Sequence, residues 1–442
     1  MIEPVKAGYK LTEVGVIPED WDVKKLCEIA EIRSGIAKNS KISVKEPIPV
    51  HYLRVANVQD GFLDLTGINK IEVSGNDIKR YAVLPGDVLM NEGGDLDKLG
   101  RGSIWRGEFN PCIHQNHVFV VRSHSCLYPE YLNIWTSGAS ARRYFLIGGK
   151  QTTNLATINK TALGKLPVAL PYLLEQYAIS NALSDTDALI GSLDRLIAKK
   201  RDLKQAAMQQ LLTGKTRLPG FTGEWQVKQL GNHLKFLRNG INSRAELTID
   251  DTVKYLHYGD IHASNSAFLS PSALPSLPSS KAHKLSRLCN GDLVFADASE
   301  DLDGIGKSVE IDGAFGIELV AGLHTIAIRF DKSILADGFK AYLQFHPRFC
   351  EQLRRLVSGT KVYATNRAHI ASIEIDLPLI EEQTAIATIL SDMDTEIAVL
   401  EQRRNKTHAL KQGMMQELLT GRIRLIDNRE KQQQDIHYAN HP

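Results

Sequence analysis

The residues of this sequence that could carry chemistry do not combine into a catalytic pattern. Gly214-Lys215-Thr216 matches the end of a phosphate-binding loop, but the complete motif needs glycine where Gln209 stands. Asp77-Ile78-Lys79 has the D-x-K spacing found in nucleases, yet Asp22-Val23-Lys24 and Asp202-Leu203-Lys204 have it too, so the pattern is close to chance. A glycine-rich cofactor loop after a first strand and an Asn/Asp-Pro-Pro-aromatic site are both missing. We therefore predict that the chain is not an enzyme.

Metal binding is no better supported. His114, His117 and Asp95 could form a set of ligands, but their spacing does not distinguish them from ordinary exposed or hydrogen-bonded side chains. The five cysteines lie far apart and include no C-x-x-C pair, so neither a zinc knuckle nor a disulfide framework is expected. No apolar run approaches the roughly 18 residues of a membrane span. We expect no metal, no membrane and a cytoplasmic location.

Composition is that of an ordinary globular protein. The 442 residues are 43% hydrophobic and 24% charged, which favours two to three domains with real cores. The formal net charge is only +2, so any contact with a nucleic acid must come from local basic patches.

The elements that would position these residues occur twice along the chain. Leu211-Leu212-Thr213-Gly214 returns as Leu418-Leu419-Thr420-Gly421, and Glu175-Gln176 returns 207 residues later as Glu382-Gln383. This period is far too long for a solenoid. It predicts two copies of a globular body followed by a long helix, most naturally related by an approximate two-fold axis.

Each body is expected to be a strand-rich α+β fold. Alternating patterns predict strands over 52–58 and 255–261, and glycine-aspartate turns open buried strands at 88–90 and 293–295. Helical segments are expected near 129–144 and 339–356. His117 at the start of another strand is matched by His324 in the second copy.

The long helices carry glutamate in the first turn and end at Gly214 and Gly421, which are good start and stop signals. About 40 residues of helix are on the order of 60 Å long. In the first, spacings of three and four join Ile179, Leu183, Thr186, Ile190, Leu193 and Ile197, continued by Leu203, Ala207 and Leu211. In the second they join Ile386, Leu390, Met393, Ile397, Leu400 and Thr407, continued by Leu410, Met414 and Leu418. This seam predicts an antiparallel coiled coil, with Lys200 and Arg404 as polar interruptions; the alternative is that each helix packs on its own body.

These signals divide the chain into five segments. They are a first body at 1–170, a central helix at 171–216, a second body at 217–377, a distal helix at 378–424 and a polar C-terminal tail at 425–442.

The repeated Glu-Gln starts and Leu-Leu-Thr-Gly ends, following two differing bodies, make the chain resemble the specificity subunit of type I restriction-modification systems. The resemblance covers Gly8 to Ile426. It implies that each body is a target recognition domain reading one half of a split double-stranded DNA site. It also implies that the helices space the bodies and bind two methyltransferase subunits, to which two restriction subunits are added. AdoMet, ATP and Mg would then be bound by those partners and no cofactor by this chain.

Residues that could contact DNA are not fixed by the resemblance, because recognition domains vary in sequence. Base edges need Arg, Lys, Asn, Gln or His on an element that reaches a groove. On this chemistry we predict contacts from Arg33, Lys38, Arg54, Asn57, Lys150, Gln151, Thr152 and Asn154 in the first body, and from Arg238, Asn242, His257, Lys361, Tyr363 and Asn366 in the second.

Two other functions are compatible with parts of the sequence. A two-domain adaptor could join protein partners without binding DNA, and a single-chain methyltransferase or nuclease could carry its own activity. The polar loops that close each body favour DNA recognition over the adaptor, and the missing catalytic motifs disfavour the enzyme.

Overall fold

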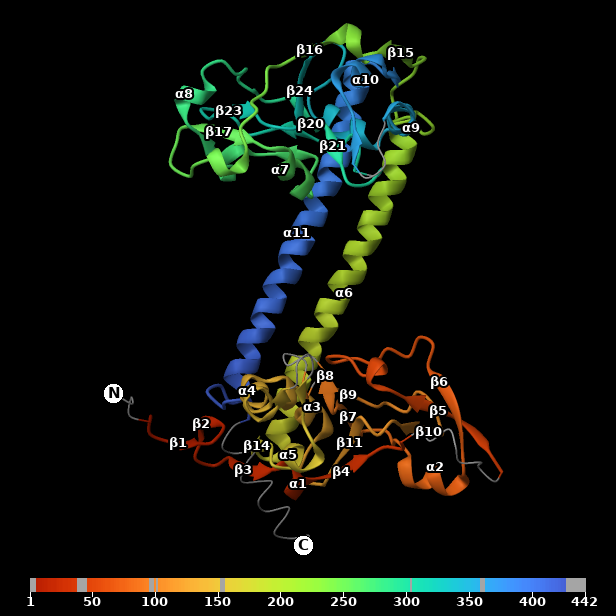
Figure 1. Ribbon diagram of the computed structural model, residues 1–442, viewed down its shortest axis with the longest axis vertical. Coiled ribbons are helices and arrows are strands. Elements are labelled where there is room, and N and C mark those ends of the chain that lie inside the picture. Colours follow the sequence, from red (N-terminus) through yellow and green to blue (C-terminus); the bar gives the residue numbers. More distant parts are fainter. Residues whose placement is uncertain are drawn as a thin grey trace. The chain divides into compact units, whose positions relative to one another are not determined.

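The computed structural model describes residues 5–37, 46–94, 99–100, 102–151, 156–302, 304–357 and 362–426. The chain forms two compact units (Figure 1). Unit 1 contains Met1–Ser192 and Arg404–Pro442, and unit 2 contains Leu193–Arg403. Unit 1 is therefore discontinuous in sequence, and each unit includes one body together with parts of both long helices.

The body of unit 1 is built on a four-stranded antiparallel sheet in the order β4-β11-β7-β9. Its strands are β4 (Ala30–Ser34), β7 (Val88–Asn91), β9 (Gly102–Ile104) and β11 (Val118–Ser123). A second sheet, β10-β5-β6, joins β5 (Ile48–Leu53), β6 (Asn69–Val73) and β10 (Cys112–His114), with β5 and β10 parallel. Smaller sheets pair β1 (Tyr9–Thr12) with β2 (Gly15–Pro18), β3 (Asp22–Lys25) with β14 (Pro167–Leu170), and β13 (Ala156–Thr157) with both β8 (Gly93–Gly94) and β12 (Lys150–Gln151). The helices are α1 (Leu26–Ile29), α2 (Gly75–Tyr81), α3 (Pro129–Ser137), α4 (Ala139–Gly148) and α5 (Lys160–Gly164).

The body of unit 2 repeats this topology. Its main sheet has the order β16-β24-β20-β22-β18, from β16 (Leu234–Phe236), β18 (Phe268–Leu269), β20 (Leu293–Ala296), β22 (Ser308–Ile311) and β24 (Thr325–Phe330). The second sheet joins β17 (Val253–Leu256), β19 (Ser276–Leu277) and β23 (Glu318–Ala321), again with one parallel pair. The two-stranded sheets are β15 (Gln226–Gln229) with β26 (Glu374–Leu377), and β21 (Ala298–Ser299) with β25 (Tyr363–Ala364). The helices are α7 (Tyr258–Ala263), α8 (Ser279–Ala282), α9 (Pro347–Leu356) and α10 (Arg367–Ser372). The predicted α+β class and duplication are confirmed.

The predicted strand over 52–58 is wrong in its second half. β5 ends at Leu53, where Arg54 N donates to Asn57 Oδ1 (2.9 Å) and the chain turns into a short 3-10 helix, Val55–Asn57. A side chain three residues ahead that accepts the backbone N–H is the capping arrangement that starts a helix. The second body makes the same change, with β17 ending at Leu256 and His257 N donating to Asp260 Oδ2 (3.0 Å) at the start of α7.

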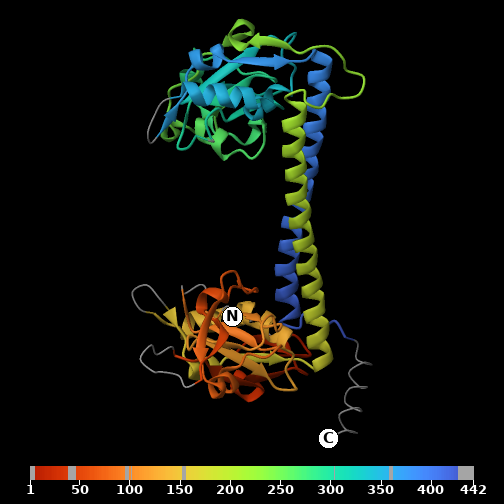
Figure 2. The ribbon, with the colours of Figure 1, turned by 90° about the vertical axis from the view of Figure 1, so that its right-hand side faces the viewer.

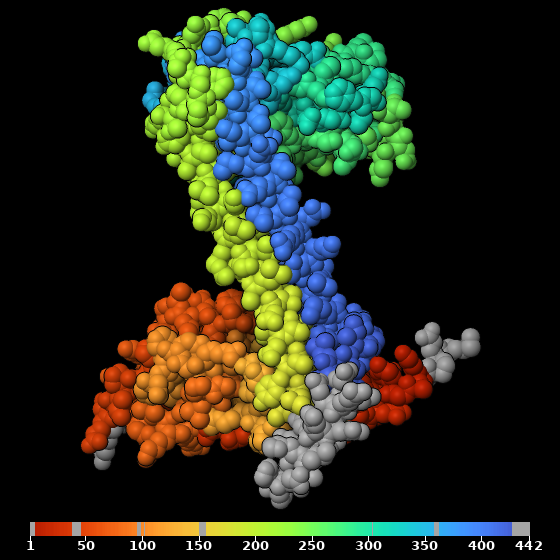
Figure 3. All heavy atoms as spheres, turned by 180° about the vertical axis from the view of Figure 1, so that it is seen from behind, coloured from red at the N-terminus to blue at the C-terminus, as the bar shows by residue number. Residues whose placement is uncertain are grey.

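The two long helices are α6 (Leu173–Leu211) and α11 (Ile380–Leu418), each 39 residues long. They lie side by side in Figures 1 and 2, and Figure 3 shows both at the surface of one face. Within unit 1, Lys411 pairs with Asp187 (2.6 Å). Within unit 2, Lys204 pairs with Asp394 and Lys200 with Glu396 (2.7 Å). Because rising numbers along α6 meet falling numbers along α11, the predicted antiparallel pairing is confirmed.

Most of the predicted seam is buried, since Ile179, Leu183, Leu193, Ile197 and Leu390 are all less than 5% exposed. The continuation through Leu203 and Leu410 is wrong, because these side chains are 46% and 60% exposed. The next residues, Lys204 and Lys411, turn toward the partner helix and form the ion pairs with aspartate described above. A long lysine stem can cover apolar surface while its charged end finds a carboxylate, so it replaces leucine at this place.

The end of each long helix completes the core of the unit that it reaches. Leu418, the last residue of α11, and Leu419 are buried in the same cluster as Ile179 and Leu183 of unit 1. In unit 2, Leu211, the last residue of α6, and Leu212 share a cluster with Ile386 and Leu390 of α11. The Leu-Leu-Thr-Gly motif is thus a docking segment for the body beside it.

A buried ion pair closes unit 1 just beyond this motif. Arg424 donates from Nη2 to Glu175 Oε2 (2.7 Å) and from Nη1 to Asp20 Oδ1 (2.9 Å), while Trp21 Nε1 donates to the same glutamate (3.0 Å). Glu175 is 0% exposed. Gly421 adopts a positive φ of 64°, and a Cβ there would lie 2.4 Å from Pro18 Cγ. Glycine is therefore needed for the chain to reach this position.

Unit 2 is closed in the same way. Arg217 donates from Nη2 to Glu382 Oε2 (2.6 Å) and lies over the ring of Trp225, while Glu382 is 2% exposed. We call Arg424–Glu175 and Arg217–Glu382 the closing pairs. The first-turn glutamate of each helix, expected from sequence as a helix-start signal, is a partner of the opposite helix end.

Candidate nucleic-acid interface

Four segments of the first body meet at one edge of its sheets. Gln115 N donates to Leu53 O (2.8 Å), which joins the β10–β11 turn to the end of β5. Glu92 N donates to His117 O (2.9 Å), and Ile158 N donates to Glu92 O (2.8 Å). The predicted polar loop after α4 is therefore connected, through β12-β13-β8, to the segment that follows β7.

The second body builds the same frame. Gly322 N donates to Leu256 O (2.8 Å), Asp297 N donates to His324 O (3.1 Å), and Thr365 N donates to Asp297 O (2.8 Å). Arg367 adds a bond from Nη2 to Leu237 O (3.1 Å), which brings in the segment that carries Arg238. We call this edge of each body the loop frame, comprising 53–58, 91–94, 115–117, 150–151 and 156–158 in the first and 256–262, 296–299, 322–324 and 363–367 in the second.

Several predicted contact residues lie outside what the structure describes. Lys38, Thr152, Asn154 and Lys361 are outside the described residues, and so is Asp95 of the considered metal set. Lys150 and Gln151 form β12 in the loop frame, and their side chains are not described.

Three other predicted residues already use their polar groups in hydrogen bonds within the body. Asn57 is 4% exposed, accepts from Arg54 N and donates to Asp64 O (2.9 Å). His257 is 7% exposed and its Nδ1 accepts from Gly259 N (3.2 Å), and burial lowers its pKa. Asn366 caps α10 by accepting from His369 N (2.9 Å). All three side chains help to build the loop frame. Asn57 and His257 are buried and so poorly placed to read bases, whereas Asn366 is exposed.

Asn242 is half-buried and donates to Glu246 Oε1 (2.9 Å), so its amide is already partnered. The remaining predicted residues present groups at or beside the loop frame. Arg33 is 29% exposed and pairs with Glu31 (3.3 Å), while Arg238 is exposed. Tyr363 is half-buried on β25.

Arg54 is the most informative of the remaining candidates. It is half-buried at the end of β5, and its buried Nε has no hydrogen-bond partner among the described residues. A buried donor without an acceptor is costly, so a ligand oxygen at this place would be favourable.

A histidine–carboxylate pair in each loop frame was missed as a candidate. His117 Nδ1 lies 2.6 Å from Glu92 Oε2, and His324 Nδ1 lies 3.1 Å from Asp297 Oδ1. The two histidine side chains are 57% and 53% exposed. The repeat of His117 as His324 was visible in the sequence, but its carboxylate partners come from another segment, so the pairing was not.

Metal and membrane sites find no support in the described part of the chain. No three His, Cys, Asp or Glu side chains there are grouped as a metal site. His114 is buried with Nδ1 2.7 Å from Val118 O, and burial lowers its pKa to about 4. No helix among the described residues has the length and apolarity needed to cross a membrane.

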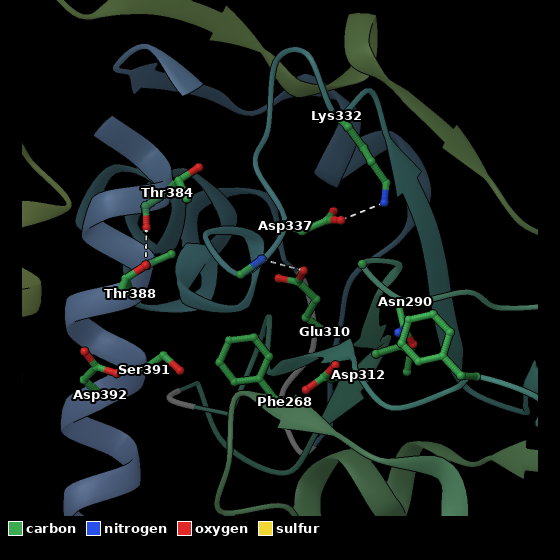
Figure 4. Close-up of a pocket in the computed structure, with 15 residues that line it drawn as sticks. Phe268, Asn290, Glu310, Asp312, Lys332, Asp337, Thr384, Thr388, Ser391 and Asp392 are labelled. Carbon is green, nitrogen blue, oxygen red and sulfur yellow. Dashed lines mark hydrogen bonds and ion pairs between the residues drawn. The ribbon is translucent and has the colours of Figure 1, made fainter. Parts of the chain in front are cut away.

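Unit 2 also contains a cavity of about 660 Å³ beside α11 (Figure 4). Glu310 there accepts from Gly338 N (2.7 Å) and Ala341 N (2.9 Å), and burial raises its pKa to about 7. Lys332 pairs with Asp337 (2.6 Å), and Asp312 and Asp392 add further carboxylates. An acidic lining whose main groups are already bonded is unsuited to a phosphate backbone, so we exclude this cavity from the interface.

The chain matches known proteins over most of its length. The family model of the type I restriction modification DNA specificity domain matches residues 18–199 and 305–408. A putative type I restriction enzyme specificity subunit, MjaX, of Methanocaldococcus jannaschii is 26% identical, covering 95% of this chain and 97% of the relative. The MjaVIII specificity subunit of the same organism is also 26% identical, covering 92% and 94%.

Two solved structures share the fold. A chain from a structure of the type I R-M system, described for complex assembly and conformational transition, has a TM-score of 0.56 and 14% identity, covering 92% of this chain and 99% of that one. The S subunit of the type I restriction-modification system from M. genitalium has a TM-score of 0.53 and 12% identity, covering 90% and 96%. With the model match spanning more than half of the sequence, this chain belongs to the type I restriction modification DNA specificity family.

Proposed function

We propose that this chain is the non-catalytic specificity subunit of a type I restriction-modification complex, in which each body reads one half of a bipartite double-stranded DNA site. The observation that carries this is the loop frame, which both bodies build from equivalent backbone hydrogen bonds while presenting different side chains. A shared backbone frame that presents different side chains suits two readers of different sequences. Contacts to base edges carry the sequence information, whereas contacts to phosphate only position the protein.

The long helices would space the bodies and bind methyltransferase subunits. Exposed apolar side chains on them support this, since Leu189, Leu196 and Leu203 recur on α6 at the heptad spacing and are each about 40% exposed or more. On α11, Val399 is 57% exposed. Exposed leucines at heptad spacing are typical of a helix that packs against another helix.

The full assembly that we propose has two methyltransferase and two restriction subunits and works in the cytoplasm. AdoMet, ATP and Mg would be bound by those partners, because the sequence of this chain holds none of the motifs that bind them. The adaptor function, joining protein partners without DNA, is the alternative.

An exchange of bodies tests the proposal. Residues 1–170 are replaced by the corresponding region of a relative that keeps Leu-Leu-Thr-Gly and the closing pair. This precaution is needed because Leu418 and Leu419 pack on this body and Arg424 bonds its Asp20. We expect one half of the methylated sequence to change and the other half to stay, as read by genome-wide mapping of methylated adenines. Exchanging 217–377 instead should change only the other half.

Unaltered methylation in both chimaeras, with the complex still assembled, would support the adaptor. Simultaneous change of both halves in one chimaera would contradict separate reading by the two bodies.

A further inference from the structure

The histidine–carboxylate pair is a feature that the two bodies share on their exposed surface. His117 and His324 stand at equivalent places before β11 and β24, and Glu92 and Asp297 at equivalent places after β7 and β20. Both bodies form the pair although the local structure around the two histidines differs. His324 has a positive φ of 55° and its ring packs edge-on against Tyr258 (5.4 Å between centroids), whereas Nε2 of His117 lies 3.2 Å from Asn116 Nδ2.

Stability does not account for the repetition. Both histidine side chains are more than half exposed, and solvent-exposed ion pairs of this kind contribute little to stability. The backbone bonds between the same segments, from Glu92 N to His117 O and from Asp297 N to His324 O, exist without either side chain.

Two bodies that recognise different base sequences still face the same sugar-phosphate backbone of DNA. Contacts to phosphate position a protein on the duplex and carry no sequence information directly. An exposed side chain that is the same in both bodies is therefore a better candidate for phosphate than for a base.

The geometry suits this task. In the imidazolium form both ring nitrogens donate, so the carboxylate holds Nδ1–H and leaves Nε2–H for a second acceptor. At His117 the Asn116 amide lies 3.2 Å from Nε2, so a phosphate oxygen would have to displace that amide. A charge-assisted hydrogen bond from Nε2–H to a phosphate oxygen is stronger than a neutral one.

We propose that His117 and His324, each oriented by its carboxylate, are a duplicated pair of phosphate contacts that hold the two bodies on DNA without contributing to sequence choice. This inference rests on the proposed function.

The test uses the full chain assembled with its methyltransferase. Dissociation constants are measured for the recognised duplex and for duplexes with one base pair changed in each half, over a range of salt concentrations. For His117→Ala and for His324→Ala we expect binding to weaken about tenfold on every duplex. The slope of log K against log salt should fall in magnitude by about 1 for each histidine removed.

Two further variants sharpen the result. His117→Lys keeps a cation at the position and should retain the salt slope. His124→Ala is the matched control and should leave binding unchanged. His124 is exposed just beyond the opposite end of β11, seven residues or about 23 Å from His117.

A changed preference at particular base pairs would overturn the inference in favour of base reading. Unchanged affinity and slope in folded variants would overturn it in favour of a purely structural pair. Failure of the unmodified complex to prefer its own duplex would contradict the proposed function itself, which is a separate result.

Discussion

At the scale of single residues, the closing pairs are the contacts whose loss should matter most. Arg424→Ala leaves the fully buried Glu175 with only the Trp21 hydrogen bond. Removing one partner of a buried ion pair typically costs about 3 kcal/mol. We expect loss of this order in the free energy of unfolding of unit 1, with hydrogen exchange measured by mass spectrometry increasing there and not in unit 2.

Arg217→Ala is the mirror experiment and should affect unit 2 alone, through Glu382. Arg422→Ala removes an exposed pair with Glu417 and should cost less than about 1 kcal/mol. Equal destabilisation by all three variants would show that the closing pairs have no special role.

The sequence identified the glutamates of the closing pairs but not their arginine partners. The Glu-Gln start was visible, yet the glutamate binds an arginine 249 positions away, and the glutamine Gln176 bonds Cys126 O (3.0 Å) and Pro171 O (2.9 Å). Likewise Asn57 was chosen for its base-reading chemistry and is buried. Residue type shows what a side chain can bond, whereas the fold decides which acceptor is present.

At the scale of elements, lengthening the two long helices tests whether their length sets the spacing of the DNA target. An insertion in α6 alone would not be a valid test of helix length. It would shift Leu212 relative to Ile386, and these two residues belong to one hydrophobic core. Four residues must be added to both helices, after Ser192 and after Arg403, where the two units divide. We expect a target with both halves intact and a spacer longer by one or two base pairs.

The expected change follows from the two periodicities. Four residues add roughly 6 Å and about 40° of helix, and one base pair adds roughly 3.4 Å and about 35° of twist. Mapping methylated sites gives the spacer length. Modification at the original spacing by an assembled double-insertion complex would show that the helices are not the ruler, and the single insertion serves as the control that should not assemble.

Elements with a strong hydrophobic periodicity were predicted well from the sequence, whereas short elements were not. The helices at Leu173–Leu211 and Ile380–Leu418 follow from apolar spacing. The turns after Leu53 and Leu256 were missed because the alternation continues past the capping residues, so a capping bond overrides the pattern. The apolar spacing predicts a buried Leu203, but this side chain is exposed because Lys204 occupies the position that faces the partner helix.

At the scale of the whole molecule, the two units differ in their continuity. Unit 2 is one uninterrupted stretch, and its clusters and closing pair all lie within 193–403. We expect a fragment of these residues to unfold cooperatively by itself in a denaturant titration. A fragment of 1–192 should not, since it lacks Leu418, Leu419 and Arg424.

Adding 404–426 to the shorter fragment, through a flexible linker, should restore cooperative unfolding. The same linked fragment carrying Arg424→Ala is the control and should restore it less. Cooperative unfolding of 1–192 without any addition would contradict the dependence of unit 1 on the second helix.

The discontinuity of unit 1 has a consequence for synthesis on the ribosome. Residues 404–426, which complete the first body, are made only after all of unit 2. At roughly 5 to 20 residues per second this delay is on the order of 10 to 40 s. During that time the first body emerges with the Glu175 carboxylate unpaired, while the second can fold to completion. A chain truncated before Arg424 would therefore contain a complete second body and a first body that lacks its closing pair. Only translation past that codon completes both bodies.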